Sequence, residues 1–156
     1  SSDLMSPRPS LPSEALVREA RSWVGTPYHH MGDIRGVGVD CGMLLVRIFC
    51  DLGICAPFDP RPYTRDWHLH QSEERYLSYV YDNAAEISRE ELAPGDIILF
   101  QFGRCFSHGA IVTSVAPLTV VHAVHDYGMV VEEVADTSPE VMRRMQKSKF
   151  FRVGSR

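Results

Sequence analysis

The chain has 156 residues, 44% of them hydrophobic and 23% charged, which is enough for one domain with a packed core. Its formal net charge of -4 argues against binding nucleic acid through a basic surface. No apolar run reaches the ~20 residues of a membrane span, and the first residues lack the apolar segment of a signal peptide. We therefore expect a flexible arm over residues 1–12, one domain over residues 13–156, and synthesis in the cytoplasm.

The first half of the chain predicts two helices. Apolar residues recur at helical spacing after Ser13, a suitable N-cap, as far as Val24, and the "GTPY" stretch then ends the pattern. After a glycine-rich loop, Asp40 is placed to cap a second helix, roughly Cys41–Leu52, which the following glycine ends.

The second half predicts an antiparallel sheet. It is preceded by a proline-broken stretch at residues 56–70 and by residues 73–82, which resemble a short helix. Short apolar and β-branched runs separated by turn residues then predict strands at 94–100, 108–115, 118–124, 128–134 and 149–153. Helices first and strands second indicate an α+β fold.

Cys41 is the first candidate for chemistry, because it directly follows Asp40 in the stretch "GVGVDCG". At the first position of a capped helix, its sulfur would lie near backbone N–H groups and the positive end of the helix dipole. Both stabilise a thiolate and lower the thiol pKa. Glycines on either side would let a substrate backbone approach. Alone, however, this pattern favours a core cysteine on an amphipathic helix over a nucleophile.

His108 and His122 are the candidates for a base and its partner. They lie 14 residues apart, in "SHGAIV" and "VVHAV", a spacing that fits two adjacent antiparallel strands. Cross-strand neighbours approach to about 5 Å, so the second imidazole could orient the first. A lone strand histidine is more often structural, but two of them placed after a helix-tip cysteine favour catalysis.

Other reactive residues have simpler explanations. Cys105 is a rival nucleophile near His108, but no helix tip would activate it. Cys50 is expected in the core, and its pairing with Cys55 stays open, since the four cysteines match no zinc pattern. His29, His30, His68 and His70 are solvated loop histidines or, as the alternative, a metal site. Trp67 and His68 are candidates for lining a substrate groove. Arg143, Arg144 and Lys147 form a solvated basic helix face or contact an anionic wall polymer.

Five motifs together resemble the NlpC family of papain-like cell-wall peptidases, and within it the phage-type members. They occur in the family's order and at its spacings, and the resemblance runs from about residue 12 to residue 153. The motifs are "WVGTPYHH", "GVGVDCGMLLVRIFCDLG", "PGDIILF", "SHGAIV" and "VVHA". The resemblance implies a papain-like fold in which N-terminal helices pack on a C-terminal antiparallel sheet, with the catalytic cysteine at a helix N-terminus.

The resemblance also implies roles for individual residues. Cys41 matches the nucleophile, His108 the general base and His122 the residue that orients the base. Tyr28 matches a tyrosine that flanks the site, near the oxyanion or the substrate amine. Asp40 matches an acidic residue that can bind the free amine of a stem-peptide L-alanine, so it has two candidate roles, cap and substrate contact.

Two further residues, Gly42 and Ser107, are also expected to contact substrate. The chain departs from the family's pattern here, because Gly42-Met43 replaces the common Ser-Gly after the nucleophile. The family's serine can contact substrate, so this replacement leaves the polarity of the pocket open.

The activity implied by the resemblance is hydrolysis of the bond between γ-D-glutamate and diaminopimelate or lysine in peptidoglycan stem peptides, without a metal or organic cofactor. The resemblance to the phage-type members implies association with a phage tail, or delivery to the cell wall by another route. Two alternatives stay open: an acyltransferase or amidase using the same thioester chemistry, and a non-enzymatic tail-tip module.

Overall fold

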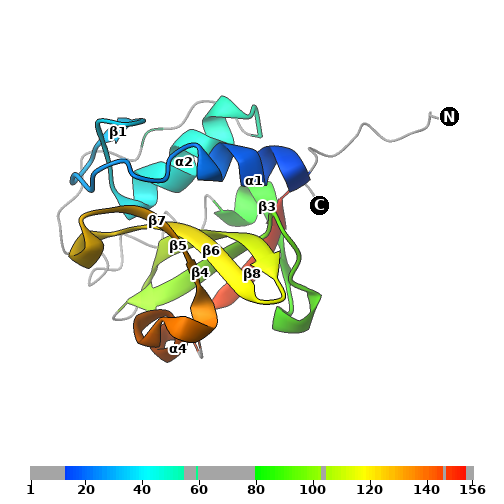
Figure 1. Ribbon diagram of the computed structural model, residues 1–156. Coiled ribbons are helices and arrows are strands. Elements are labelled where there is room, and N and C mark those ends of the chain that lie inside the picture. The colour runs from blue at the N-terminus through cyan, green and yellow to red at the C-terminus, as the bar shows by residue number, and fades with distance from the viewer. Residues whose placement is uncertain (1–12, 55–58, 60–79, 103–104, 146, 154–156) are drawn as a thin grey trace, which may run out of the picture.

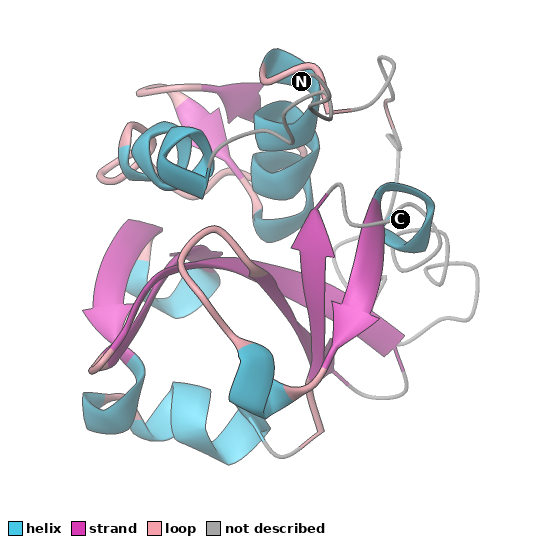
Figure 2. Ribbon diagram, turned by 90° about the vertical axis from the view of Figure 1, so that its right-hand side faces the viewer, coloured by secondary structure: helices cyan, strands magenta, loops and turns pink. Residues whose placement is uncertain are grey.

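The computed structural model describes residues 13–54, 59, 80–102, 105–145 and 147–153. These residues form three layers, with two helices, α1 and α2, on one side of a curved antiparallel sheet and a short helix, α4, on the other (Figure 1). The view turned by 90° shows the same separation of the helices by the sheet (Figure 2). The predicted α+β class, with N-terminal helices packed on a C-terminal antiparallel sheet, is confirmed.

The two N-terminal helices are those that the sequence predicts, with adjusted ends. Helix α1 spans Ser13–Arg21, and the chain continues through a turn that buries Trp23. The first prediction was therefore three residues too long, because Trp23 N bonds Ala20 O in a turn that no longer continues the helix. Helix α2 spans Cys41–Asp51 with Asp40 as its N-cap, as predicted. No helix in the described part of the chain is long and apolar enough to cross a membrane.

Six strands form the main sheet in the order β3-β8-β4-β5-β6-β7, and every neighbouring pair is antiparallel. The strands are β3 Ala84–Ile87, β4 Ile97–Phe102, β5 Cys105–Val115, β6 Leu118–Val124, β7 Met129–Val134 and β8 Lys149–Val153. All five predicted strands are present, and β3 was missed because only pairing with β8 extends this short segment.

The remaining elements are short. Strands β1 Asp33–Ile34 and β2 Gly38–Val39 pair within the loop that the sequence left irregular. Helix α4 spans Pro139–Met145. Single helical turns lie at η3 Arg89–Glu91, η4 His125–Tyr127 and η5 Ala135–Thr137. Of the predicted helix at 73–82, the described residues 80–82 are helical and the rest lies outside the described residues, as does most of the irregular stretch at 56–70.

Alternate residues of each strand point to opposite faces of the sheet, and helices cover both faces. One face packs against α1 and α2 through a cluster that includes Leu99, Ile111 and Val121. The other face packs against α4 through a cluster that includes Phe100 and Val112. Strand β5 is therefore covered on both sides, which fixes its register and the side to which each of its residues points.

Two valines in the second half of β5 provide a test of this packing. Val112 is fully buried on the α4 face, whereas Val115 is 45% exposed. Val112→Ala should lower the free energy of unfolding by about 2 kcal/mol, through lost transfer energy and the cavity left behind. The matched control Val115→Ala should change it by less than about 0.5 kcal/mol. Urea unfolding followed by fluorescence measures both, and equal effects would contradict the burial of Val112 beneath α4.

Candidate active site

The carboxylate of Asp40 ties the tip of α2 to the preceding loop. Its Oδ1 accepts a hydrogen bond from Met43 N at 2.8 Å, and its Oδ2 accepts one from Met31 N at 2.7 Å. His30 Nδ1 lies 3.8 Å from Oδ2, and Asp40 is only 2% exposed. The predicted capping role is confirmed. Both oxygens are already occupied by backbone donors, so the predicted contact with a substrate amine stays a prediction.

The loop before Asp40 holds its shape through close backbone packing. A Cβ at Gly32 would lie 2.7 Å from the backbone of Gly38, and one at Gly38 would lie 2.8 Å from His29 Cβ. Met31 has a φ of 64°, a conformation that is costly for a residue with a side chain. Its hydrogen bond to Asp40 helps to hold that conformation. Gly32 and Gly38 therefore allow the chain to pack on itself. For Gly38, the sequence pattern had predicted a role in the approach of substrate.

Cys41 lies at the first position of α2 and is half-buried. The Tyr28 hydroxyl and the backbone N–H groups of Cys41 and Gly42 interact with its sulfur and favour the thiolate. Burial of the thiol and the nearby negative charge of Asp40 outweigh these donors and raise the pKa of Cys41 to about 12. The predicted lowering of this pKa is therefore wrong for the enzyme without substrate, because desolvation exceeds the effect of the helix tip.

Gly42 and Met43 lie beneath this tip. Both are buried, and Met43 belongs to the core cluster shared by α2 and the sheet. Met43 stands where the family commonly has glycine, and its side chain fills the core. The predicted contact between Gly42 and substrate stays a prediction.

Tyr28 connects the thiol to the turn between β6 and β7. Its backbone N donates to Gly128 O at 2.8 Å, and its ring meets the His125 ring edge-on with centroids 5.4 Å apart. Burial, followed by the charges of Cys41 and Asp40, raises the pKa of Tyr28 above its ordinary value. Tyr28 is therefore a protonated donor at neutral pH, facing the Cys41 sulfur.

The two strand histidines are in direct contact, as their spacing predicts. His108 Nε2 lies 2.9 Å from His122 Nδ1, and both rings are buried beside Phe100. His122 Nε2 in turn lies 2.6 Å from Glu133 Oε2. The register pairs His108 with Phe100, so the histidines point to the α4 face of the sheet. The predicted proton transfer between Cys41 and His108 stays a prediction.

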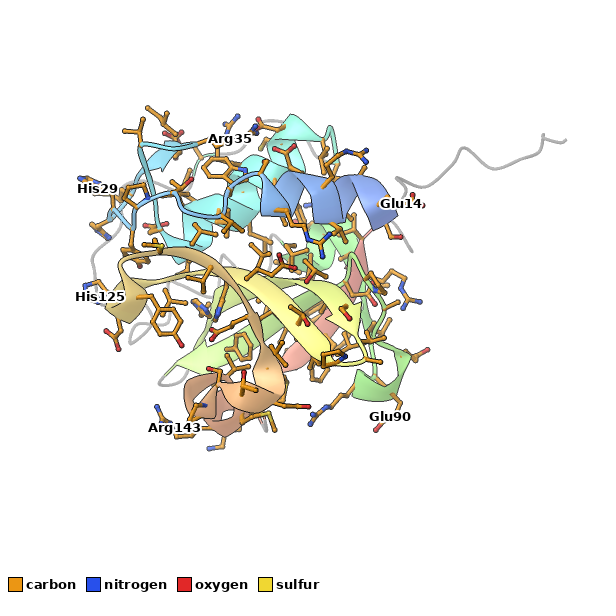
Figure 3. The ribbon with its side chains drawn as sticks, viewed as in Figure 1. Glu14, His29, Arg35, Glu90, His125 and Arg143 are labelled. Carbon is orange, nitrogen blue, oxygen red and sulfur yellow. The ribbon has the colours of Figure 1, made fainter. Side chains whose placement is uncertain are left out.

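The described residues thus form two clusters. The thiol cluster consists of Tyr28, Asp40 and Cys41, and the imidazole cluster consists of His108, His122 and Glu133. The turn η4 joins them, because it follows the strand of His122 and its residue His125 contacts Tyr28. Figure 3 shows His125 and His29 at the same end of the molecule, away from Glu14 and Glu90.

Three residues near the site were missed by the sequence analysis. Glu133 contacts His122, Tyr127 donates to Glu133 Oε1 at 3.1 Å, and His125 packs on Tyr28. Only the charged residues inside the apolar strand "GMVVEEV" hinted at Glu133.

Several of the other predicted residues cannot be placed. The side chains of Cys105 and Ser107 lie outside the described residues, as do Cys55, Trp67, His68 and His70. Within the described ranges, no three His, Cys, Asp or Glu side chains are grouped to hold a metal ion.

A sequence model of the NlpC/P60 family matches residues 25–149, and the chain belongs to this family. This membership defines the class of a cysteine-peptidase-type hydrolase. The phage-type subclass stays a prediction. No curated protein matches the sequence significantly.

Solved structures share the fold. The NlpC/p60 domain of the peptidoglycan hydrolase SagA is 20% identical with a TM-score of 0.56, over 81% of this chain and 92% of that one. NlpC1 from Trichomonas vaginalis is 15% identical with a TM-score of 0.61, over 86% of this chain and 43% of that one. An N-acetylmuramoyl-L-alanine amidase from Bacteroides uniformis is 12% identical with a TM-score of 0.59, over 92% and 99%. At these identities, the likeness concerns the fold.

The raised pKa of Cys41 can be tested through Asp40. Its negative charge raises the thiol pKa, so Asp40→Asn should lower that pKa and increase the thiolate fraction at a given pH. Alkylation of Cys41 by iodoacetamide at about pH 8 should be slow in the parent protein and about 3- to 10-fold faster in the variant.

Peptide mapping by mass spectrometry gives this rate separately for Cys50, at the other end of α2, which serves as the internal control. An equal acceleration at Cys50 would indicate loosening of the helix instead of a charge effect. An unchanged or slower rate at Cys41 would contradict the electrostatic role of Asp40.

Proposed function

We propose that this protein is a cysteine endopeptidase that cleaves peptidoglycan stem peptides, with Cys41 as nucleophile and His108 as general base. The observation that carries the proposal is the helix-tip thiol of Cys41, held by the Tyr28 hydroxyl, in a chain of the NlpC/P60 family. The structural neighbour SagA is described as a peptidoglycan hydrolase, which supports the substrate class. The proposed scissile bond is that between γ-D-glutamate and diaminopimelate or lysine.

The raised thiol pKa decides the order of the proton transfer. Cys41 is a neutral thiol at physiological pH, so a standing ion pair with histidine is not expected in the substrate-free enzyme. The proton moves to His108 as the sulfur attacks the amide carbonyl, in a step driven by general-base catalysis. His108 uses Nδ1 for this transfer, since its Nε2 faces His122.

The rest of the reaction follows acyl-transfer chemistry. The Cys41 backbone N–H and the Tyr28 hydroxyl stabilise the negative oxygen of the tetrahedral intermediate. The C–N bond then breaks, the departing amine takes the proton from His108, and a thioester to Cys41 remains. Water attacks this thioester while His108 accepts its proton. The C–S bond then breaks, the carboxylic acid is released, and His108 returns the proton to the Cys41 sulfur. Contacts between substrate and Asp40, Gly42 or Ser107 belong to this proposal.

The delivery of the enzyme is part of the same proposal. The resemblance to phage-type members of the family favours a protein associated with a phage tail, where it would open the cell wall during injection. Antibodies to the protein should label purified particles at the tail. Labelling confined to the lysed cell fraction would instead favour another route to the wall.

The function is tested by digesting purified peptidoglycan and identifying the new termini by mass spectrometry. Cys41→Ala should abolish the release of fragments, because the nucleophile is gone, and should leave the fold intact. Cys105→Ala should keep most of the activity. New termini at N-acetylmuramic acid and L-alanine would instead indicate an amidase, and acyl transfer to an added amine or lipid would indicate an acyltransferase. Tight binding to tail proteins without any turnover would indicate a structural module.

The two histidines should differ in their effect on rate. His108→Ala removes the base and should lower kcat/KM by about 1,000-fold or more. His122→Asn should cost less, about 10- to 100-fold, because an amide can still hydrogen-bond His108. Thermal unfolding of each variant shows whether the fold is kept. A larger loss for His122→Asn than for His108→Ala, at equal stability, would reverse the assignment of base and partner.

A further inference from the structure

Glu133 is the outermost residue of the imidazole cluster, beyond the two histidines. It lies on β7, where the register pairs it with Val120 and pairs His122 with Val131. Glu133 and His122 are thus diagonal neighbours on one face of the sheet, within reach of a long side chain. The 2.6 Å separation of Glu133 Oε2 and His122 Nε2 is typical of a hydrogen bond strengthened by charge. The two side chains are only 19% and 4% exposed.

The carboxylate of Glu133 is held in its ionised form. The hydrogen bond from His122 is the main reason why its pKa is lowered, and the Tyr127 and Ser138 side chains add further donors. An ionised carboxylate can only accept hydrogen bonds, so the nitrogen that faces it must carry the proton. His122 therefore carries a proton on Nε2.

This proton determines the rest of the chain of hydrogen bonds. In a neutral imidazole, one nitrogen donates and the other accepts. With its proton on Nε2, neutral His122 presents Nδ1 as an acceptor, and the contact at 2.9 Å then requires His108 to donate from Nε2. Neutral His108 is left with a lone pair on Nδ1, which is the form that a general base needs.

We propose that Glu133 is a positioning residue that fixes the tautomers of both histidines and thereby leaves Nδ1 as the basic nitrogen of His108. The inference rests on the proposed function for its catalytic consequence, whereas the tautomers are a property of the protein alone. Once His108 has accepted a proton, the same carboxylate stabilises the imidazolium through His122. Glu133 itself does not touch the substrate.

The tautomers are tested by NMR on protein labelled with ¹⁵N in its histidine rings. The Cys41→Ala protein serves as the background, so that the result does not depend on turnover. At about pH 8, both His108 and His122 should carry their proton on Nε2. Spectra of His108→Gln and His122→Gln variants assign the two rings.

Substitutions of Glu133 should then change the tautomers and the rate together. Glu133→Leu removes the acceptor, so His122 should populate both tautomers, and kcat/KM should fall about 10- to 100-fold with little change in KM. Glu133→Gln keeps an acceptor oxygen without the charge, and should preserve the tautomers and restore part of the rate.

Two matched variants act as controls. Glu132→Gln alters the neighbouring carboxylate, which contacts Arg21 and Thr113 instead. It should change neither the tautomers nor the rate. Tyr127→Phe removes only the second hydrogen bond to Glu133 and should also keep the tautomers.

The outcomes separate this inference from the proposed function. A proton on Nδ1 of His108 in the parent protein, or unchanged tautomers and rate in Glu133→Leu, would overturn the role of Glu133. The expected tautomers and their loss in Glu133→Leu, in a protein that leaves peptidoglycan intact, would support the positioning role and reject the peptidase.

Discussion

The buried carboxylate of Asp40 is the interaction on which this site depends. It accepts the Met43 N–H at the tip of α2 and the Met31 N–H of the preceding loop, and so joins the two segments. Without these bonds, the first turn of α2 would leave donors unsatisfied in a buried place, and the strained conformation at Met31 would lose its support. The position of Cys41 relative to Tyr28 follows from this arrangement.

The same carboxylate acts, together with burial, on the thiol of Cys41, the proposed nucleophile. Cys41 occupies a helix tip, a position that favours a thiolate, but burial and the charge of Asp40 reverse that preference. A second carboxylate, Glu133, lies beyond the histidine pair and favours positive charge there. The charge of Asp40 thus favours the protonated thiol of Cys41 in the protein without substrate. The charge of Glu133 stabilises the proton on the histidine pair after its transfer. This combination suits a thiol that reacts only when a substrate carbonyl is in place.

The sheet brings these groups to one end of the molecule. Strands β5, β6 and β7 carry one member each of the chain from His108 through His122 to Glu133, all on the face that α4 covers. The turn after β6 then returns to Tyr28 beside the thiol. The geometry of the imidazole cluster therefore depends on strand register, since a shift of one strand by one residue would place its side chain on the opposite face of the sheet.

Short-range patterns in the sequence predict the local features. The cap by Asp40 spans only three residues, the strands follow a period of two, and the spacing of His108 and His122 fits a hairpin, so all three could be predicted. The short strands β1, β2 and β3 escaped prediction because they exist only through pairing with partners. Only the tertiary structure decided the raised pKa of Cys41 and the contact of Glu133 with His122. Both depend on burial and on distances between residues far apart in sequence, and these quantities are set by packing, which no local pattern records.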